Sequence, residues 1–119
     1  MHLHHLALRT RDLPRLRAFY EGLLGLVVVR ESAGRSVWLE AGAAVVMLEA
    51  AEAGEPEITA GSRELVAFAI APGERAAWEA RLAGAGVAVE ARTDHTLYFR
   101  DPDGRRVGVS SYPLVHSRE

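Results

Sequence analysis

A chain of 119 residues, nearly half of them apolar, is long enough to form one domain with a buried core. Its net charge of −2 and pI near 6.2 give no basic surface of the kind that binds nucleic acid. The absence of cysteine excludes disulfides, thiolate metal sites and a cysteine nucleophile, and no apolar run approaches the length of a membrane span. With no signal peptide recognisable, we expect a soluble cytoplasmic protein.

Residues 3–26 predict a strand that runs directly into an amphipathic helix. In the strand, Leu6 and Leu8 alternate with other residues, so they share one face and His5 lies on the opposite one. We expect the helix to cover the leucine face, which leaves His5 on the uncovered face. The same alternation assigns two further histidines to the other side: His2 and His4.

The helix that follows has recognisable signals at both ends. Asp12 stands at the N-cap position, Pro14 lies in the first turn, and Gly25 supplies the stop. Apolar residues recur between them at helical spacing: Leu13, Leu16, Phe19 or Tyr20, and Leu23 or Leu24.

Three short strands and a polar connector complete the first half of the chain. The strands are predicted at 27–30, 37–40 and 45–49, with a turn at 32–36 and a hairpin at Gly42. The connector is rich in glycine, proline and glutamate. We place the first module at 1–50 and the connector at 51–63.

The pattern then repeats, which predicts two βαβββ modules and an α+β fold. The second module spans 64–112 and is followed by a tail at 113–119, within a single domain of 1–119. Its strands and helix match the first module in order: 65–70, 77–84, 87–90, 96–99 and 107–109. The DPDG sequence at 101–104 predicts a turn.

Two such modules, related by a pseudo-twofold, would place their helices outside and curl eight strands into an open cup. One strand face then packs under the helices: Leu6, Leu8, Val46, Leu48, Val66, Phe68, Ile70, Val107 and Val109. The alternate residues face the cup: His5, Ala7, Arg9, Met47, Glu49, Leu65, Ala67, Gly108 and Ser110. On the middle strands, Trp38 shares a face with Glu40, and Tyr98 with Thr96.

This double layout, together with the segments HHLALRTRDLPRLRAFYEGLLGL and YFRDPDGRRV, resembles the vicinal oxygen chelate superfamily. That superfamily includes glyoxalases, extradiol dioxygenases, fosfomycin-resistance thiol transferases and bleomycin-resistance proteins. The amino-acid sequence of these segments is most similar to that of the fosfomycin-resistance branch. The resemblance is specific for the fold and much less so for a reaction. It implies a small-molecule ligand and a homodimer.

Metal-using members of this superfamily place a His, Glu or Gln ligand at four cup positions, two in each module. The resemblance assigns these positions here to His5, Met47, Leu65 and Gly108. A divalent cation needs three or four nitrogen or oxygen donors, and of these four side chains only His5 supplies one. Glu49 faces the same way as Met47 but stands two residues, about 7 Å, further along the strand. We therefore expect no metal cofactor, with His5 the ligand if any metal binds.

The uncharged candidates leave alternatives open. His5 could be a residual metal ligand, a ligand-binding group or a partly buried side chain with a satisfied hydrogen bond. Trp38 could form an aromatic wall for a ligand, or it could belong to the core or to a dimer interface. Tyr98 corresponds to a cup-facing tyrosine of the fosfomycin-resistance pattern, and it could equally take part in ordinary sheet packing.

The charged candidates also have two interpretations. Glu49 could act as a general base if the cup excludes water around it, or it could lie exposed at the rim. Arg9 and Arg106 could bind an anionic ligand, or they could form salt bridges with Glu49 and Glu40.

Three functions follow as hypotheses. The first is a binder similar to bleomycin-resistance proteins, which holds a small, partly apolar molecule without a metal. The second is a divalent-metal lyase or thiol transferase that uses His5. The third is a metal-free enzyme with His5, Tyr98 or Glu49 as acid or base. The first hypothesis assigns eight residues to the ligand: His5, Arg9, Trp38, Met47, Glu49, Leu65, Tyr98 and Gly108.

Overall fold

The computed structural model describes residues 1–114 and divides the chain into two compact units. The first unit is Met1–Thr59, and the second begins at Ala60. This boundary falls inside the connector that the sequence predicts at 51–63. That residues 1–119 behave as a single domain stays a prediction, and most of the predicted tail, with His116, lies outside the described residues.

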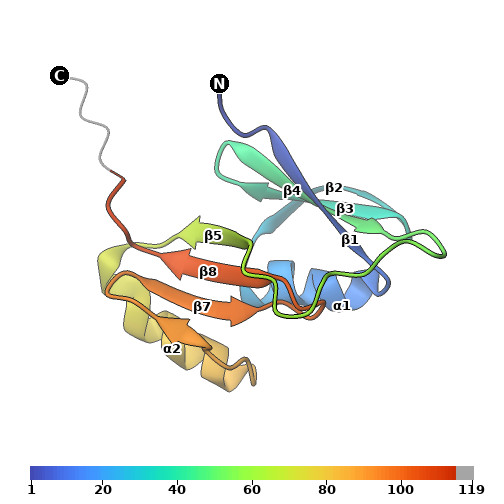
Figure 1. Ribbon diagram of the computed structural model, residues 1–119. Coiled ribbons are helices and arrows are strands. Elements are labelled where there is room, and N and C mark those ends of the chain that lie inside the picture. The colour runs from blue at the N-terminus through green and yellow to red at the C-terminus, as the bar shows by residue number, and fades with distance from the viewer. Residues whose placement is uncertain (115–119) are drawn as a thin grey trace. The chain divides into compact units, whose positions relative to one another are not determined.

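The first unit is a four-stranded sheet with one helical segment (Figure 1). Its strands pair in the order β1-β4-β3-β2; β1 and β4 are parallel, and the other pairs are antiparallel. In chain order its elements are β1 (His5–Thr10), α1 (Leu13–Arg17), η1 (Ala18–Leu23), β2 (Val27–Ser32), β3 (Ser36–Ala41) and β4 (Ala44–Ala50).

The second unit has the same topology, with the order β5-β8-β7-β6 and a parallel β5–β8 pair. In Figure 1 it is the yellow-to-red part of the chain. Its elements are β5 (Leu65–Ala69), η2 (Pro72–Glu74), α2 (Arg75–Gly84), β6 (Ala91–Arg92), β7 (Thr96–Arg100) and β8 (Arg106–Ser110). The α+β class and the two repeated βαβββ modules are therefore confirmed, while the cup stays a prediction.

The strand predicted at 87–90 is wrong, because β6 contains only Ala91–Arg92. The amide of Val87 donates to the carbonyl of Leu82 at 2.9 Å, which ties this segment to the end of α2 instead of to a strand. The chain reaches the sheet only at Glu90, whose amide donates to the carbonyl of Tyr98 at 2.8 Å. The shortened edge strand is the main departure from the repeat in the second unit.

Strand alternation sorts the side chains of both sheets as predicted. Five of the nine residues expected under the helices are fully buried: Leu8, Val46, Leu48, Val107 and Val109. The other four are half-buried: Leu6, Val66, Phe68 and Ile70. The opposite face of each sheet is therefore the one that can carry a site.

The helical segment of the first unit begins and ends where the sequence predicts. The side chain of Asp12 accepts a hydrogen bond from the amide of Arg15 at 3.1 Å, and Gly25 has a φ of 80° beyond the last turn. Between them, α1 gives way to a π-helical stretch, η1, whose wider turn buries both Phe19 and Tyr20. Their rings meet edge to face at 5.0 Å.

Candidate functional site

The site face of the first unit is the face of its sheet opposite the buried leucines. Cross-strand pairing arranges it in three rows: Arg9 with Glu49 and Ser36, Ala7 with Met47 and Trp38, and His5 with Val45 and Glu40. The sequence-predicted residues of the first module therefore lie together on one face. Met47 is not opposite His5 but one pair further along, which is a diagonal relation.

His5 is exposed and in contact with its neighbour in the chain. Its Nδ1 atom lies 2.9 Å from Nδ1 of His4, and the two rings meet edge to face at 5.1 Å. Alternation does not keep these two histidines apart, because their rings turn toward each other at the start of β1, although the carbonyl of His4 still accepts from the amide of Val45 at 3.1 Å. One ring nitrogen of His5 is thus already engaged.

Arg9 is held by two carboxylates. It forms a two-point contact with Glu55, at 2.9 and 3.0 Å, and donates to Glu49 at 3.2 Å. The hydrogen bonds from Arg9, reinforced by one from the amide of Glu52, lower the pKa of Glu55 to about 2, and the two carboxylates raise the pKa of Arg9. Salt bridging is therefore the interpretation that the structure supports for Arg9, and it binds Glu49 into an ion pair.

Trp38 and Met47 lie opposite each other in the middle of this face, and both are half-buried. The guanidinium of Arg30 stacks over the indole of Trp38, with Cζ 5.0 Å from the ring centroid. Sequence reasoning missed Arg30, because simple alternation from Val28 places it on the other face. A β-bulge between the two residues changes that, and no sequence signal marks the bulge.

The site face of the second unit is tightly packed at a glycine. Gly108 is buried and lies between Ala67 and Tyr98 in cross-strand register. A Cβ at Gly108 would lie 3.3 Å from the carbonyl oxygen of Leu97 and 3.5 Å from a methyl group of Leu65. Leu65 itself is 41% exposed.

Charged side chains cover Tyr98 in this unit. The guanidinium of Arg106 lies 4.3 Å from the centroid of its ring. Glu90 accepts from Arg106 at 2.8 Å and from Arg100 at 2.8 and 3.0 Å, and these contacts, led by the one with Arg100, lower the pKa of Glu90. Arg106 therefore forms its salt bridge with Glu90, not with the Glu40 or Glu49 considered from the sequence.

The donors on the two site faces do not fit a divalent cation. The four positions assigned by the resemblance present an imidazole, a thioether, an isobutyl group and a bare backbone: His5, Met47, Leu65 and Gly108. Glu49, the acidic alternative on the same strand as Met47, is engaged by Arg9 at 3.2 Å. Within residues 1–114 no three His, Asp or Glu side chains gather closely enough to hold a metal ion.

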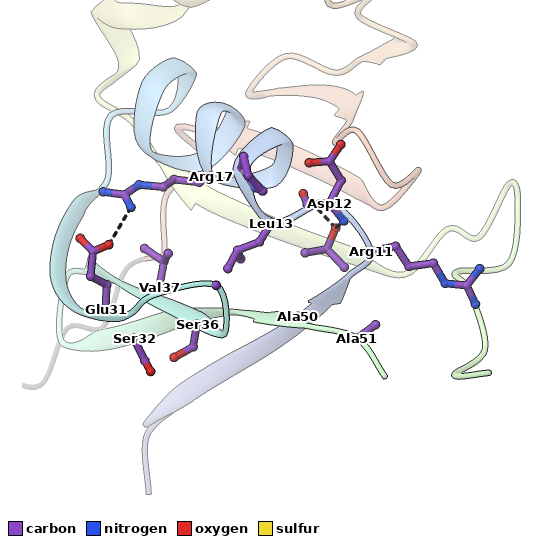
Figure 2. A pocket seen from close by; sticks show the side chains of 13 residues that line it. Arg11, Asp12, Leu13, Arg17, Glu31, Ser32, Ser36, Val37, Ala50 and Ala51 are labelled. Carbon is purple, nitrogen blue, oxygen red and sulfur yellow. Dashed lines mark hydrogen bonds and ion pairs between the residues drawn. The ribbon is translucent and has the colours of Figure 1, made fainter. Parts of the chain in front are cut away.

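A groove of about 430 Å³ lies elsewhere in the first unit, between the start of α1 and the β2–β3 turn (Figure 2). Arg17 reaches across it to Glu31 at 3.1 Å, and Arg11 is paired with Glu57 at 2.6 Å. None of the eight sequence-predicted site residues lines this groove. The remaining charged residue that lines the groove, Asp12, caps α1 through the amide of Arg15, so each of its charged side chains already has a partner.

Several solved structures share the fold of this chain over nearly its whole length. An integron cassette protein from the mobile metagenome of V. cholerae is 28% identical, with a TM-score of 0.73 over 95% of this chain and 96% of that one. Lactoylglutathione lyase from Agrobacterium tumefaciens is 24% identical, with a TM-score of 0.73 over 92% of both chains. A variant of the fosfomycin resistance protein FosX from Listeria monocytogenes, solved with Mn(II) and a dihydroxypropylphosphonic acid, is 18% identical, with a TM-score of 0.77 over 95% and 91%.

The sequence itself gives the family. Residues 2–109 match the family described as the Glyoxalase/Bleomycin resistance protein/Dioxygenase superfamily, which is nearly the whole chain. Among the described residues, no helix has the length and hydropathy needed to cross a membrane. The chain belongs to the Glyoxalase/Bleomycin resistance protein/Dioxygenase superfamily.

Proposed function

We propose that this protein binds a small, partly apolar molecule on the site face of its sheets without using a divalent metal. The single observation that carries the proposal is the donor set: of the four positions where metal-using relatives hold their cation, only His5 offers a nitrogen or oxygen side-chain donor. A protein of this family with such a set keeps the scaffold for a ligand but lacks the means to polarise it through a metal.

The surroundings of these positions support a binding role. Trp38 and Met47 provide an apolar, half-buried centre, while His5 and the Arg9–Glu49 pair lie along its sides. Ligand sites have this composition, an apolar lining with a few polar groups that set orientation. In the second unit, Leu65 contributes exposed apolar surface of the same kind, and the ring of Tyr98 lies beneath the guanidinium of Arg106. We assign the ligand to the eight predicted residues: His5, Arg9, Trp38, Met47, Glu49, Leu65, Tyr98 and Gly108.

The test is calorimetric titration of untagged protein with a panel of small aromatic and heteroaromatic compounds, with and without EDTA. We expect saturable binding that EDTA leaves unchanged and that Trp38→Ala weakens about tenfold or more. Trp78→Ala is the matched control, because Trp78 is also half-buried and stacked against an arginine but lies on α2. Absence of saturable binding across the panel would overturn the proposal.

Metal analysis separates this proposal from a metal enzyme. After loading with Ni, Zn, Mn or Co and removal of free metal, we expect less than one metal ion per two chains. Stoichiometric metal that is lost in His5→Ala would show that the chain has kept a metal centre and would refute the metal-free proposal.

We also propose that the protein is a homodimer, in line with the family. Light scattering on the purified chain tests this, and a monomer at micromolar concentration would contradict it.

A further inference from the structure

The edge strand β2 contains one extra residue that redirects a charged side chain. Val28 pairs with Leu39, which is fully buried under the helix, and Arg30 pairs with Trp38. An uninterrupted ladder would place residue 29 opposite Trp38 and Arg30 on the buried face. The bulge between Val28 and Arg30 moves the arginine to the site face.

A contact beyond the bulge supports the same register. Glu31 pairs with Val37 and so points to the helix side, where it accepts from Arg17 at 3.1 Å. Without the extra residue, Arg30 would take that place and would meet Arg17 with like charge. The bulge therefore places Glu31 on the helix side, where it pairs with Arg17, and places Arg30 on the site face over Trp38.

Arg30 has no carboxylate partner among the described residues. Its contact is the stack on Trp38, whereas Arg9, on the same face, is held by Glu49 and Glu55. Glu40 shares the face with Arg30 but forms no ion pair with it within residues 1–114. The guanidinium keeps its planar set of N–H donors for another group, and stacking on the indole fixes its plane.

We propose that Arg30 and Trp38 recognise the anionic group of the ligand, so that the preferred ligand is a small carboxylate with a planar apolar body. The carboxylate pairs with the fork of Arg30, and the apolar body covers Met47, which lies opposite Trp38 in the next strand. This inference rests on the proposed function and adds to it the class of the ligand.

The experiment compares naphthoate with naphthamide, which have the same body and differ in charge. Both are titrated calorimetrically at neutral pH in the presence of EDTA, into the parent protein, Arg30→Gln and Arg81→Gln. Arg81 is the matched control because it stacks on Trp78 at 4.9 Å, in the same kind of pair but on α2. We expect naphthoate to bind about tenfold tighter than naphthamide, and only Arg30→Gln to abolish that difference.

The outcomes separate the two proposals. Equal binding of the two compounds, or a preference for naphthoate that survives in Arg30→Gln, would overturn the role of Arg30 while leaving a metal-free binding site. Failure of both compounds and of the wider panel to bind would overturn the proposed function itself. Circular dichroism of Arg30→Gln verifies that the exposed substitution leaves the fold intact.

Discussion

The two units share a topology but differ in what they place on it. In the first, the helical segment buries Leu16, Phe19 and Tyr20, and the edge strand β2 is six residues long. In the second, α2 buries only Leu82 among its residues, and the edge strand β6 has two residues. The repeated topology therefore forms even when its helix buries few side chains and its edge strand is short.

The site faces differ in the same direction. In the first unit His5 is exposed, and Arg30, which has no carboxylate partner among the described residues, stacks on Trp38. In the second unit Gly108 is buried and Arg106 covers the ring of Tyr98. Candidate chemistry is concentrated in the first unit, although both units have the same strand order. In a duplicated fold, topology is thus a poor guide to how function is divided between the copies.

The largest expected effects test whether the two cores are equally important. Leu16 and Leu82 are both 0% exposed, one in each unit, so Leu16→Ala and Leu82→Ala should each lower the free energy of unfolding by about 2–5 kcal/mol. Urea denaturation followed by circular dichroism measures both. Two separate transitions, each shifted by only one of the variants, would show that the units unfold independently.

A second prediction concerns the turn before β8, which has no charged counterpart in the short hairpin of the first unit. The side chain of Asp101 is fully buried, accepts from the amides of Asp103 and Arg105 at 2.8 and 3.1 Å, and pairs with the Arg105 guanidinium at 3.2 Å. Asp101→Asn removes one of the two carboxylates that pair with Arg105, since Asp103 remains at 3.3 Å, and should cost about 2 kcal/mol in urea denaturation. An unchanged midpoint would mean that the amide replaces the carboxylate fully.

A smaller effect separates the starts of the two helices. Asp12 accepts a hydrogen bond from the amide of Arg15 at the start of α1, whereas Glu74, in η2 just before α2, accepts one from the amide of Ala71 at 2.7 Å. Asp12→Ala should therefore cost about 1 kcal/mol. Thermal unfolding monitored by calorimetry gives the comparison with Asp12→Asn, whose side-chain oxygen can still accept from the amide of Arg15 and which should cost less; equal costs would contradict the capping role of Asp12.

The smallest effects concern pH. The folded pKa of Glu55 is about 2, below its ordinary value near 4.5, so its contact with Arg9 stabilises the fold above about pH 4.5 and this stabilisation is lost as the pH falls toward 2. Glu90 shifts in the same direction through Arg100. Glu55→Gln and Glu90→Gln should each flatten the acid limb of stability against pH, measured by urea denaturation between pH 2 and 7. A steeper acid limb in either variant would reverse the assigned sign.

Much of the fold could be predicted because it depends on local patterns. The alternation around Leu6 and Leu8, the cap at Asp12 and the glycine at Gly25 each determine their structure within a few residues. The repeat then transferred these assignments to the second module. Only β6 failed, where the amide of Val87 bonds to the helix end instead of to a strand.

The site was less predictable because it depends on single-residue irregularities. The bulge that redirects Arg30, the contact between His4 and His5, and the two-point contact of Arg9 with Glu55 have no periodic signature. Each results from a strand end, an extra residue or a distant partner. Strand alternation determines which face of the sheet these side chains occupy. Contacts of this kind then determine which of their polar groups remain able to bind a ligand.

The two arginine–tryptophan stacks have a practical consequence. The chain contains two tryptophans, Trp38 in the first unit and Trp78 in the second, so each unit has its own intrinsic fluorophore. Replacing either one with phenylalanine leaves tryptophan emission from a single half of the chain. Optical titration of these two variants can therefore follow events in each half separately, without an added dye.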